Sequence, residues 1–229
     1  MAIPHWEVII IKTTSLFGKT EAESSSYEQG RQKAALLFLS QEPKKIIASK
    51  QFPHDETHVY SRLLDRTYRI DLDSGRSEYQ ENESWFYSDY YSAMILYDLI
   101  GYSDASCGAA YSYTALQNLS TVFNAHSYAG ERMFDPVVRS IATAPDRFRN
   151  ACMSLGGTED SKGDISYVIP CLFYHGTLSV ILRFYAEDEE FPPQLTVLFD
   201  KNTLQYMHYE TAWYLAAHLL KRISDLAGF

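Results

Sequence analysis

Three short segments of alternating apolar and polar residues, separated by tight-turn signals, constrain the fold of this chain most strongly. They cover residues 59–64, 67–72 and 76–79, and the turns between them fall at 65–66 and 73–75. Side chains alternate between the two faces of a strand, and such short turns connect antiparallel neighbours. The pattern therefore predicts an antiparallel meander of three strands.

The C-terminal part repeats this kind of pattern. Residues 165–174 and 177–187 predict a hairpin, in which Pro170 places the first strand at an edge or a bulge. A further strand is predicted at 195–199, and a turn leads from it into 204–207.

Between these segments the apolar residues recur at helical spacing. Ser24 to Ser26 supply N-cap candidates for the first helix, and Pro43 ends it. Residues 101–135 show no clear period over their length, so we expect loops and short helical turns there. Helices are predicted at residues 21–40, 84–100, 136–142, 145–155 and 209–226.

The last helix is predicted to be amphipathic. At 100° per residue its buried face holds Tyr209, Trp213, Ala216, Leu220 and Ile223. The opposite face is predicted to be solvated and holds Thr211, His218, Lys221 and Arg222. Together these patterns predict an α+β protein whose antiparallel sheet or sheets, a meander and a C-terminal hairpin, pack against several helices including this long one.

The length of 229 residues fits a single domain over residues 1–229, in which 1–24 form an N-terminal extension. Lys and Arg total 20 against 29 Asp and Glu, which gives a net charge of −9. This charge opposes binding to nucleic acid and to anionic lipid.

No stretch approaches the about 20 apolar residues that a bilayer span needs, and no signal peptide is recognisable. We therefore expect a soluble protein without a membrane partner. Cys107, Cys152 and Cys171 lie far apart in the sequence and form no framework of pairs. This spacing favours a reducing compartment, the cytoplasm.

Several familiar catalytic motifs are absent. Gly18–Lys19–Thr20 lacks the upstream glycine of a phosphate-binding loop, since position 13 is Thr13. The segment from Asp71 to Gly75 lacks the spacing of a calcium loop and is predicted to be a hairpin turn. HExxH, GxSxG and GxGxxG do not occur, so the sequence identifies neither a catalytic centre nor a cofactor.

The 18 tyrosines are the most unusual feature of the composition. Tyrosine combines apolar area with a polar tip, which suits the wall of a binding cleft and also the boundary of a core. Both interpretations stay open at this point. The candidate ligand-binding residues are Tyr167, Arg183, Asp188, Glu189 and Trp213.

A second set of residues suggests metal binding. Glu189, Asp200, His208 and Glu210 offer carboxylate and imidazole ligands around the last strand and the last helix. Alternatively, the acidic run is a solvated loop, and Glu210 stabilises the helix dipole. A cysteine nucleophile would need a nearby histidine, which the sequence does not place.

Four segments resemble the domain-of-unknown-function family 3786. They are residues 163–170, 188–192, 198–202 and 206–211, and the similarity extends over most of the chain from about residue 25. The family occurs in bacteria and archaea, many of them anaerobes. Some relatives carry an added iron–sulfur cluster domain, which implies an accessory role in redox or cofactor metabolism. This chain lacks the cysteine cluster of that domain.

Three functional hypotheses follow. The first is a non-catalytic binding or accessory module whose tyrosine-rich cleft holds a small molecule, a cofactor or a protein partner. The second is a metal-dependent enzyme, such as a hydrolase, that uses Glu189, Asp200, His208 and Glu210. The third is a protein-interaction subunit with a large apolar patch.

Overall fold

The computed structural model describes residues 21–104, 106–119, 134–173 and 176–229, and only the backbone for residues 21–25. The helices are α1 (Glu21–Ser40), α2 (Pro43–Lys50), α3 (Tyr90–Gly101), α5 (Asp135–Thr143), α6 (Pro145–Ser154), α7 (Thr203–Tyr206) and α8 (Tyr209–Ala227), with a 3-10 turn at Leu116–Asn118. The strands are β1 (His58–Leu63), β2 (Arg66–Asp71), β3 (Ser77–Glu81), β4 (Ser84–Tyr87), β5 (Tyr113–Ala115), β6 (Thr158–Glu159), β7 (Ile165–Phe173), β8 (Thr177–Tyr185) and β9 (Gln194–Asp200).

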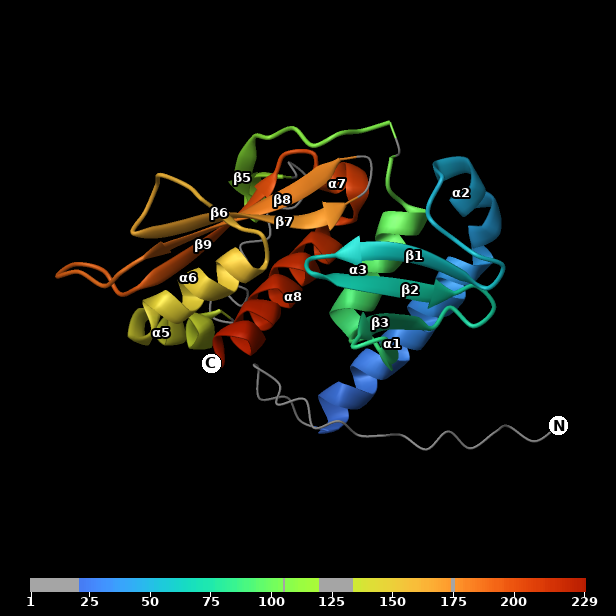
Figure 1. Ribbon diagram of the computed structural model, residues 1–229, viewed down its shortest axis with the longest axis horizontal. Helices are drawn as coiled ribbons and strands as arrows, with labels where there is room; N and C mark the ends of the chain where they lie inside the picture. Colours follow the sequence, from blue (N-terminus) through green and yellow to red (C-terminus); the bar gives the residue numbers. More distant parts are fainter. Residues whose placement is uncertain (1–20, 105, 120–133, 174–175) are drawn as a thin grey trace.

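All strands belong to one antiparallel sheet. Its order is β4-β3-β2-β1-β7-β8-β9-β5, and β6 pairs with β7 off this path. The meander and the C-terminal hairpin are therefore confirmed, together with the α+β class. The two groups of strands meet where Leu63 pairs with Leu172 and the amide of Leu64 donates to the carbonyl of Cys171 at 2.8 Å. The sheet consequently consists of a meander half and a C-terminal half joined at a narrow junction (Figure 1).

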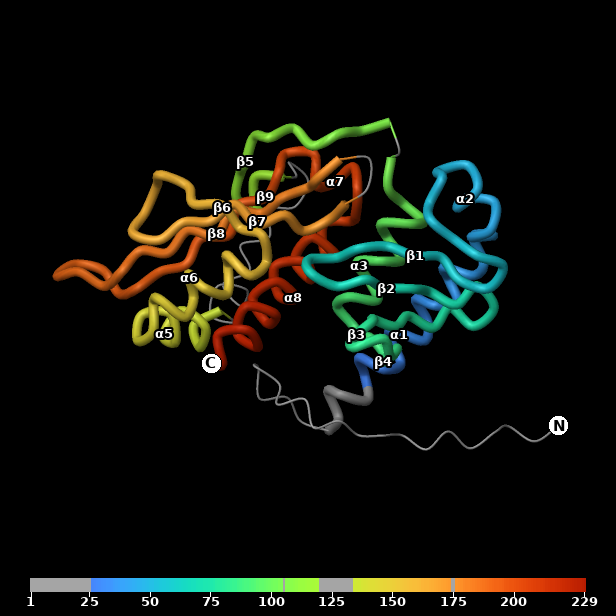
Figure 2. Tube along the Cα trace, in the orientation of Figure 1, coloured from blue at the N-terminus to red at the C-terminus, as the bar shows by residue number. Residues whose placement is uncertain are grey.

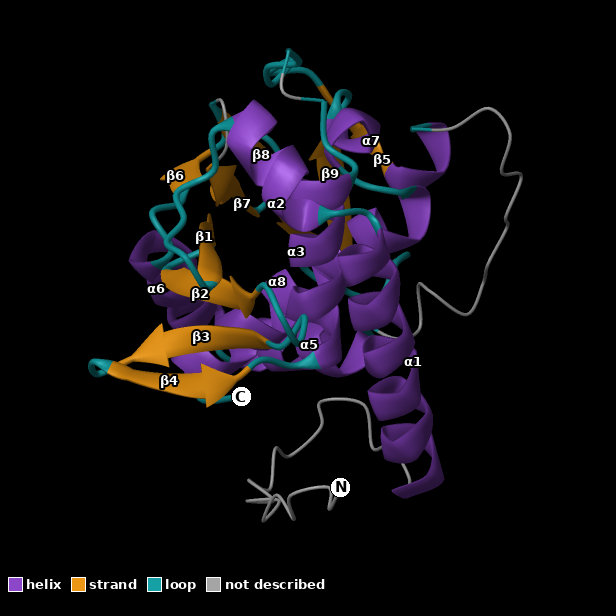
Figure 3. Ribbon diagram, turned by 90° about the vertical axis from the view of Figure 1, so that its right-hand side faces the viewer, coloured by secondary structure: helices purple, strands orange, loops and turns teal. Residues whose placement is uncertain are grey.

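Helices α1, α3 and α8 lie on one side of the meander half (Figures 1 and 3). The strand residues that point toward them are apolar and buried, including Val59, Leu63 and Ile70. In the view of Figure 2, α8 lies between the two groups of strands, and it packs against both α3 and α6. None of the described helices lies over the other side of the meander (Figure 3), so the described part of the chain leaves its side chains open to solvent.

The helix predicted from residue 84 begins six residues later, and the segment before it is strand β4. Asn82 and Glu83 both have positive φ, 47° and 66°, which produces the tight turn that pairs β4 with β3. Asp89 then caps α3 by accepting a hydrogen bond from the Ser92 amide. The spacing of Phe86 and Tyr90 matches a helix by coincidence, since Phe86 belongs to a strand.

The first helix ends at Ser40, before Pro43, as predicted, but its N-cap was predicted wrongly and the next helix was missed. Pro43 opens α2 as a first-turn residue, a position where the backbone N–H that proline lacks would have no partner within the helix. Ser24 to Ser26 lie inside α1, which begins at residue 21. The segment predicted after the last strand, 204–207, is mostly the short helix α7.

The boundaries of α8 agree with the prediction, but its solvated face does not. Thr211 and His218 are buried, at 3% and 6% exposure. The single-face prediction failed because α8 packs against α3 on one side and α6 on another, so burial extends around most of the helix.

The C-terminal hairpin agrees with the prediction in detail. The pairing of β7 with β8 shifts by one residue between Pro170 and Leu172, which is the bulge that a proline inside a strand requires. The turn at 174–175 lies outside the described residues, as do residues 105 and 120–133 of the irregular segment predicted at 101–135. The described part of that segment is mainly loop, with the short strand β5 and the 3-10 turn. None of the described helices combines the length and apolar character needed to cross a membrane.

Candidate functional site

The solvent side of strands β1 to β4, which we call the meander face, carries a continuous row of polar and aromatic side chains. Tyr60 pairs with Arg69, Arg69 with Glu78, and Glu78 with Tyr87, so one cross-strand row spans all four strands. Side chains alternate along a strand, so their neighbours on the inner face are core residues. The alternation of the sequence thus places this row on one accessible surface.

Two arginines on the meander face converge on one carboxylate. Arg69 donates from Nε and from Nη2 to Oε2 of Glu78, at 2.8 and 2.6 Å. Arg76 approaches the other oxygen of Glu78, with Nε 3.0 Å from Oε1. Charge-assisted contacts of this kind fix the planes of both guanidinium groups.

Aromatic rings support the same two arginines. The guanidinium carbon of Arg69 lies 4.2 Å from the ring centre of Trp85, and that of Arg76 lies 4.7 Å from the ring centre of Tyr87. Tyr60 packs beside Trp85, with 6.2 Å between ring centres. Cation–π contacts stabilise an arginine without using its N–H groups, so each guanidinium keeps an edge for hydrogen bonding.

An open depression of about 380 Å³ lies on this surface, and its lining consists of His58, Arg69, Asp71, Ser74, Arg76 and Glu78. Burial would raise the pKa of Asp71, but hydrogen bonds from Ser74 and Asp73 outweigh it and hold that pKa below its usual value. The lining therefore offers two cations, two carboxylates, a hydroxyl and an imidazole. Such a site can bind a polar molecule that carries donors and acceptors side by side.

A second cluster lies along the antiparallel seam between α3 and α8, with an Asp–His pair near each end. Asp98 and His208 form the exposed pair, in which Nδ1 of the histidine lies 3.0 Å from the carboxylate. Asp89 and His218 form the other pair, with 3.6 Å between Nδ1 and Oδ2. Nε2 of His218 lies 3.3 Å from the hydroxyl of Tyr68, which is buried. Neither pair could be predicted from the sequence, because the partners are more than 100 residues apart.

The charge of Asp89 contributes to stability. Burial alone would raise its pKa, but His218 and the hydrogen bonds from Ser92 outweigh this and hold the pKa below the usual value. A carboxyl group whose pKa is lowered in the folded state stabilises the fold above its unfolded pKa of about 4, and this contribution disappears as the pH falls through the folded-state pKa.

Asp89→Asn is therefore expected to cost about 1 kcal/mol near neutral pH, since asparagine keeps the N-cap role and removes only the charge. The difference from the wild type should shrink as the pH falls below about 4. Urea unfolding at pH 7, 5, 4 and 3 measures this. An equal difference at every pH would contradict the role assigned to the charge.

The tyrosines of α3 and α8 pack against one another. Tyr90 and Tyr91 both contact Tyr214, with ring centres 5.4 and 5.5 Å apart, and Tyr214 contacts Trp213. Trp213 in turn stacks on Phe134 at 5.9 Å. These contacts favour the core-boundary interpretation for these aromatic residues, including the ligand candidate Trp213.

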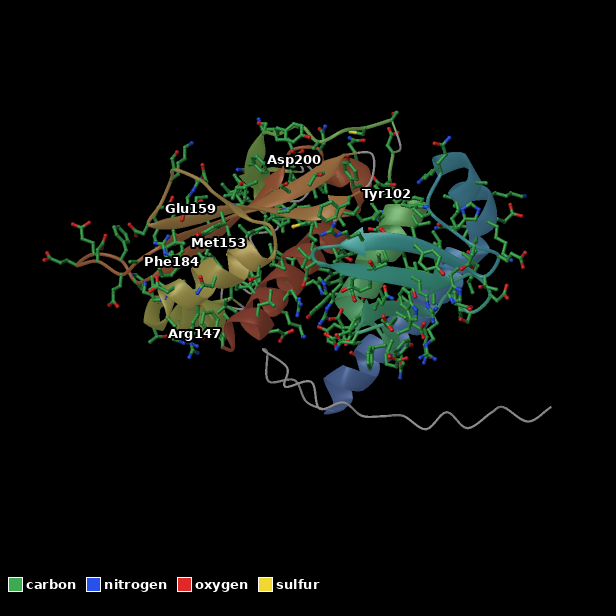
Figure 4. All side chains as sticks on the ribbon, in the orientation of Figure 1. Tyr102, Arg147, Met153, Glu159, Phe184 and Asp200 are labelled. Atoms are coloured by element: carbon green, nitrogen blue, oxygen red, sulfur yellow. The ribbon has the colours of Figure 1, made fainter. Side chains whose placement is uncertain are left out.

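The four predicted metal ligands are not brought together. No group of three or more His, Cys, Asp or Glu that could hold a metal ion occurs in the described parts of the chain, which include all four. Glu189 lies in the exposed loop between β8 and β9, and His208 pairs with Asp98. Asp200 is fully buried beside β5 (Figure 4) and accepts hydrogen bonds from backbone amides. Glu210 is an exposed acidic residue in the first turn of α8, which fits the alternative helix-dipole role.

The remaining predicted ligand residues have partners within the protein. Arg183 donates to Asp160 at 2.9 Å, and Tyr167 is buried with its hydroxyl donating to Glu159. The Asp188 carboxylate accepts the amides of Glu190 and Phe191, and these bonds lower its pKa. Each of these residues therefore has a structural contact, and they lie on the C-terminal half of the sheet rather than on the meander face.

The sequence did contain a signal for the meander face. The polar members of the alternating pattern, Tyr60, Arg69, Asp71 and Glu78, follow directly from the predicted strands. The tight turns also determine the register of the paired strands, and this register places Arg69 opposite Glu78. Trp85 and Tyr87 could not be added, because β4 was predicted as helix.

Comparison with known proteins identifies one family. The model of Domain of unknown function (DUF3786) matches residues 42–222, which include the meander face and the seam between α3 and α8. No curated protein and no solved structure matches the chain.

Proposed function

We propose that this chain, which belongs to the DUF3786 family, is a module that binds a small polar molecule on the meander face. The observation that carries this proposal is the pair of arginines that converge on Glu78 in an open depression, each backed by an aromatic ring. Binding at this surface requires no chemical step.

The balance of charges supports a neutral or zwitterionic ligand. Arg69 and Arg76 are matched by Asp71 and Glu78 within the lining, so the depression carries little net charge to attract a simple anion. The net charge of −9 on the chain further disfavours polyanions such as nucleic acid. Trp85 and Tyr87 flank the polar groups and hold the arginines in place, and the guanidinium carbon of Arg31 also lies 3.4 Å from the centre of the Tyr87 ring. Sugars, polyols and amino acids combine these properties.

Arg69→Gln is expected to weaken binding of such a ligand by about tenfold or more, because it removes a charge-assisted hydrogen bond worth roughly 1.5–3 kcal/mol. A library of neutral sugars, polyols and amino acids, screened by saturation-transfer NMR, would identify the ligand. Isothermal titration calorimetry of the variant then measures the loss.

Arg147→Gln is the matched control, since Arg147 is an exposed arginine on α6, away from the meander (Figure 4). It should bind the ligand as the wild type does. The proposal is wrong if no compound of the library binds more tightly than about 1 mM, or if both variants bind equally well.

We further propose that the chain is a single domain that works in the cytoplasm. One cluster of buried apolar residues includes both Phe38 near the start and Ala227 near the end, which supports a single domain. All three cysteines are free thiols, which supports a reducing compartment. Burial raises the pKa of Cys152 and of Cys171 to about 12, so these two thiols are unreactive.

A further inference from the structure

His208 is held in one orientation by two contacts with the same carboxylate. Its backbone N–H donates to Oδ2 of Asp98 at 2.8 Å, and its ring Nδ1 lies 3.0 Å from both oxygens of Asp98. A carboxylate only accepts hydrogen bonds, so Nδ1 must carry the proton. In the neutral imidazole the lone pair is therefore on Nε2.

The imidazole of His208 is accessible while its carboxylate partner is not. The side chain of His208 is 62% exposed, whereas that of Asp98 is only 14% exposed. The ring of Tyr102 packs against the imidazole, with 4.1 Å between ring centres. Figure 4 shows Tyr102 at the end of α3. With Nδ1 held by the carboxylate, Nε2 is the nitrogen of this exposed imidazole that is left for reaction.

The other described histidines lack this combination. His218 is also paired with an aspartate, but its side chain is only 7% exposed and its Nε2 faces the hydroxyl of Tyr68. His54 is exposed, yet its Nδ1 lies 2.8 Å from the backbone oxygen of Phe52, a neutral acceptor. His58 has a carboxylate near each ring nitrogen, with Asp55 3.7 Å from Nδ1 and Asp71 3.8 Å from Nε2, and its side chain is only 19% exposed. Among the residues that the structure describes, the arrangement therefore belongs to His208.

The surroundings suit a reaction in which negative charge develops. His208 is the N-cap residue of α8, and its side chain makes no capping hydrogen bond to the first turn. The positive end of the helix dipole thus lies beside the imidazole and favours an oxyanion. Asp98 stabilises the imidazolium that forms when Nε2 gains a bond.

We propose that Asp98 and His208 form a second site, independent of the meander face, that transfers acyl groups from small activated esters to water. The lone pair of Nε2 attacks the carbonyl carbon, and the leaving oxygen departs with the electrons of the ester bond. The product is an acyl-imidazolium, because Nδ1 keeps its proton. Water then attacks its carbonyl carbon, the bond to Nε2 breaks, and the acid and one proton are released as the neutral imidazole is restored. His208 is the catalytic residue, and Asp98 is a positioning residue that fixes its tautomer.

The test uses the full chain with p-nitrophenyl acetate and follows release of p-nitrophenolate. His208→Gln should lower the second-order rate constant about tenfold or more. His54→Gln removes an exposed imidazole whose Nδ1 faces a backbone oxygen, and Arg147→Gln removes an exposed arginine on α6. Both variants should stay within about twofold of the wild type. Equal rates for the wild type and His208→Gln, or an equal loss in His54→Gln, would overturn the proposal.

Asp98→Asn tests the positioning role. The tautomer of His208 is measured, which would not change if Asp98 only stabilised the fold. The ¹⁵N chemical shifts of the His208 ring should show the proton mainly on Nδ1 in the wild type and distributed over both nitrogens in the variant. The esterase rate should fall about fivefold or more, as expected when the reactive tautomer is depleted. An unchanged tautomer with an unchanged rate would refute the role of Asp98. Circular dichroism verifies that the variant is folded.

Discussion

Asp200→Ala is expected to destabilise the protein by about 3–5 kcal/mol, the cost of leaving several buried polar groups without a partner. The Asp200 side chain is fully buried, and its two oxygens accept three backbone amides. Oδ1 accepts those of Ala110 and Asn202 at 3.0 and 2.8 Å, and Oδ2 accepts that of Tyr111 at 2.7 Å. Alanine removes both acceptor oxygens and with them all three hydrogen bonds. The free energy of unfolding in urea measures the loss.

Two further variants, Asp200→Asn and Glu189→Gln, distinguish the loss of hydrogen-bond acceptors from the loss of a negative charge. Asp200→Asn keeps one acceptor oxygen and should lose less stability than alanine. Glu189→Gln removes a carboxylate from an exposed loop and should change stability by at most about 0.5 kcal/mol. If Asp200→Ala behaved like Glu189→Gln, the buried carboxylate would not hold the segment before β5 in place. A loss of about 3–5 kcal/mol in Asp200→Ala, the size expected, would show that Asp200, which was predicted as a metal ligand, has a structural role.

Elements whose signals are local could be predicted from the sequence. The strands of the meander and the last helix were predicted to within about two residues, because tight turns and helical periodicity are properties of neighbouring residues. Strand β4 was missed because the spacing of its aromatic residues is compatible with a helix as well as with a strand. The junction of Leu63 with Leu172 joins segments about 100 residues apart, and no local pattern determines such a pairing.

The same distinction explains the fate of the candidate site residues. His208 and Glu210 were grouped with Asp200 because they are near one another in sequence. Two residues separated by one position at a helix start point in different directions, so sequence proximity did not bring their side chains together. The partners that His208 and His218 do have, Asp98 and Asp89, come from α3. Only the packing of α3 on α8 creates these pairs.

The two sides of the meander half explain where function can reside. Its inner side packs against helices through residues such as Val59 and Ile70, which cannot be exchanged for polar ones without loss of the core. Its outer side carries Arg69, Arg76 and Glu78, which hold one another in place above aromatic rings. A rigid sheet with one free face presents these groups without a change in shape, so little ordering entropy is lost on binding.

Gly157→Ala is expected to cost about 3 kcal/mol, the upper end of the usual range for overpacking. Gly157 follows α6 and precedes β6, and a Cβ at this position would lie 2.6 Å from the backbone oxygen of Cys152 and 2.5 Å from Cδ1 of Ile169. The side chain of Ile169 can rotate, but the oxygen cannot, because it accepts the Gly157 amide at 2.9 Å. Either this hydrogen bond or the position of β6 must change. Urea unfolding at neutral pH provides the measurement.

The neighbouring Gly156 provides the control. It adopts a backbone conformation that favours glycine, but there is room beside it for a Cβ atom. Its φ is +77°, while an added Cβ would meet only Pro170 at an ordinary distance of 3.6 Å. Gly156→Ala should therefore cost about 1–2 kcal/mol, the penalty of a left-handed conformation for a residue with a Cβ. Equal losses for both variants would show that conformation alone governs this turn. A larger loss for Gly157→Ala would show that close contact between α6 and β7 fixes how the C-terminal half of the sheet packs on its helices.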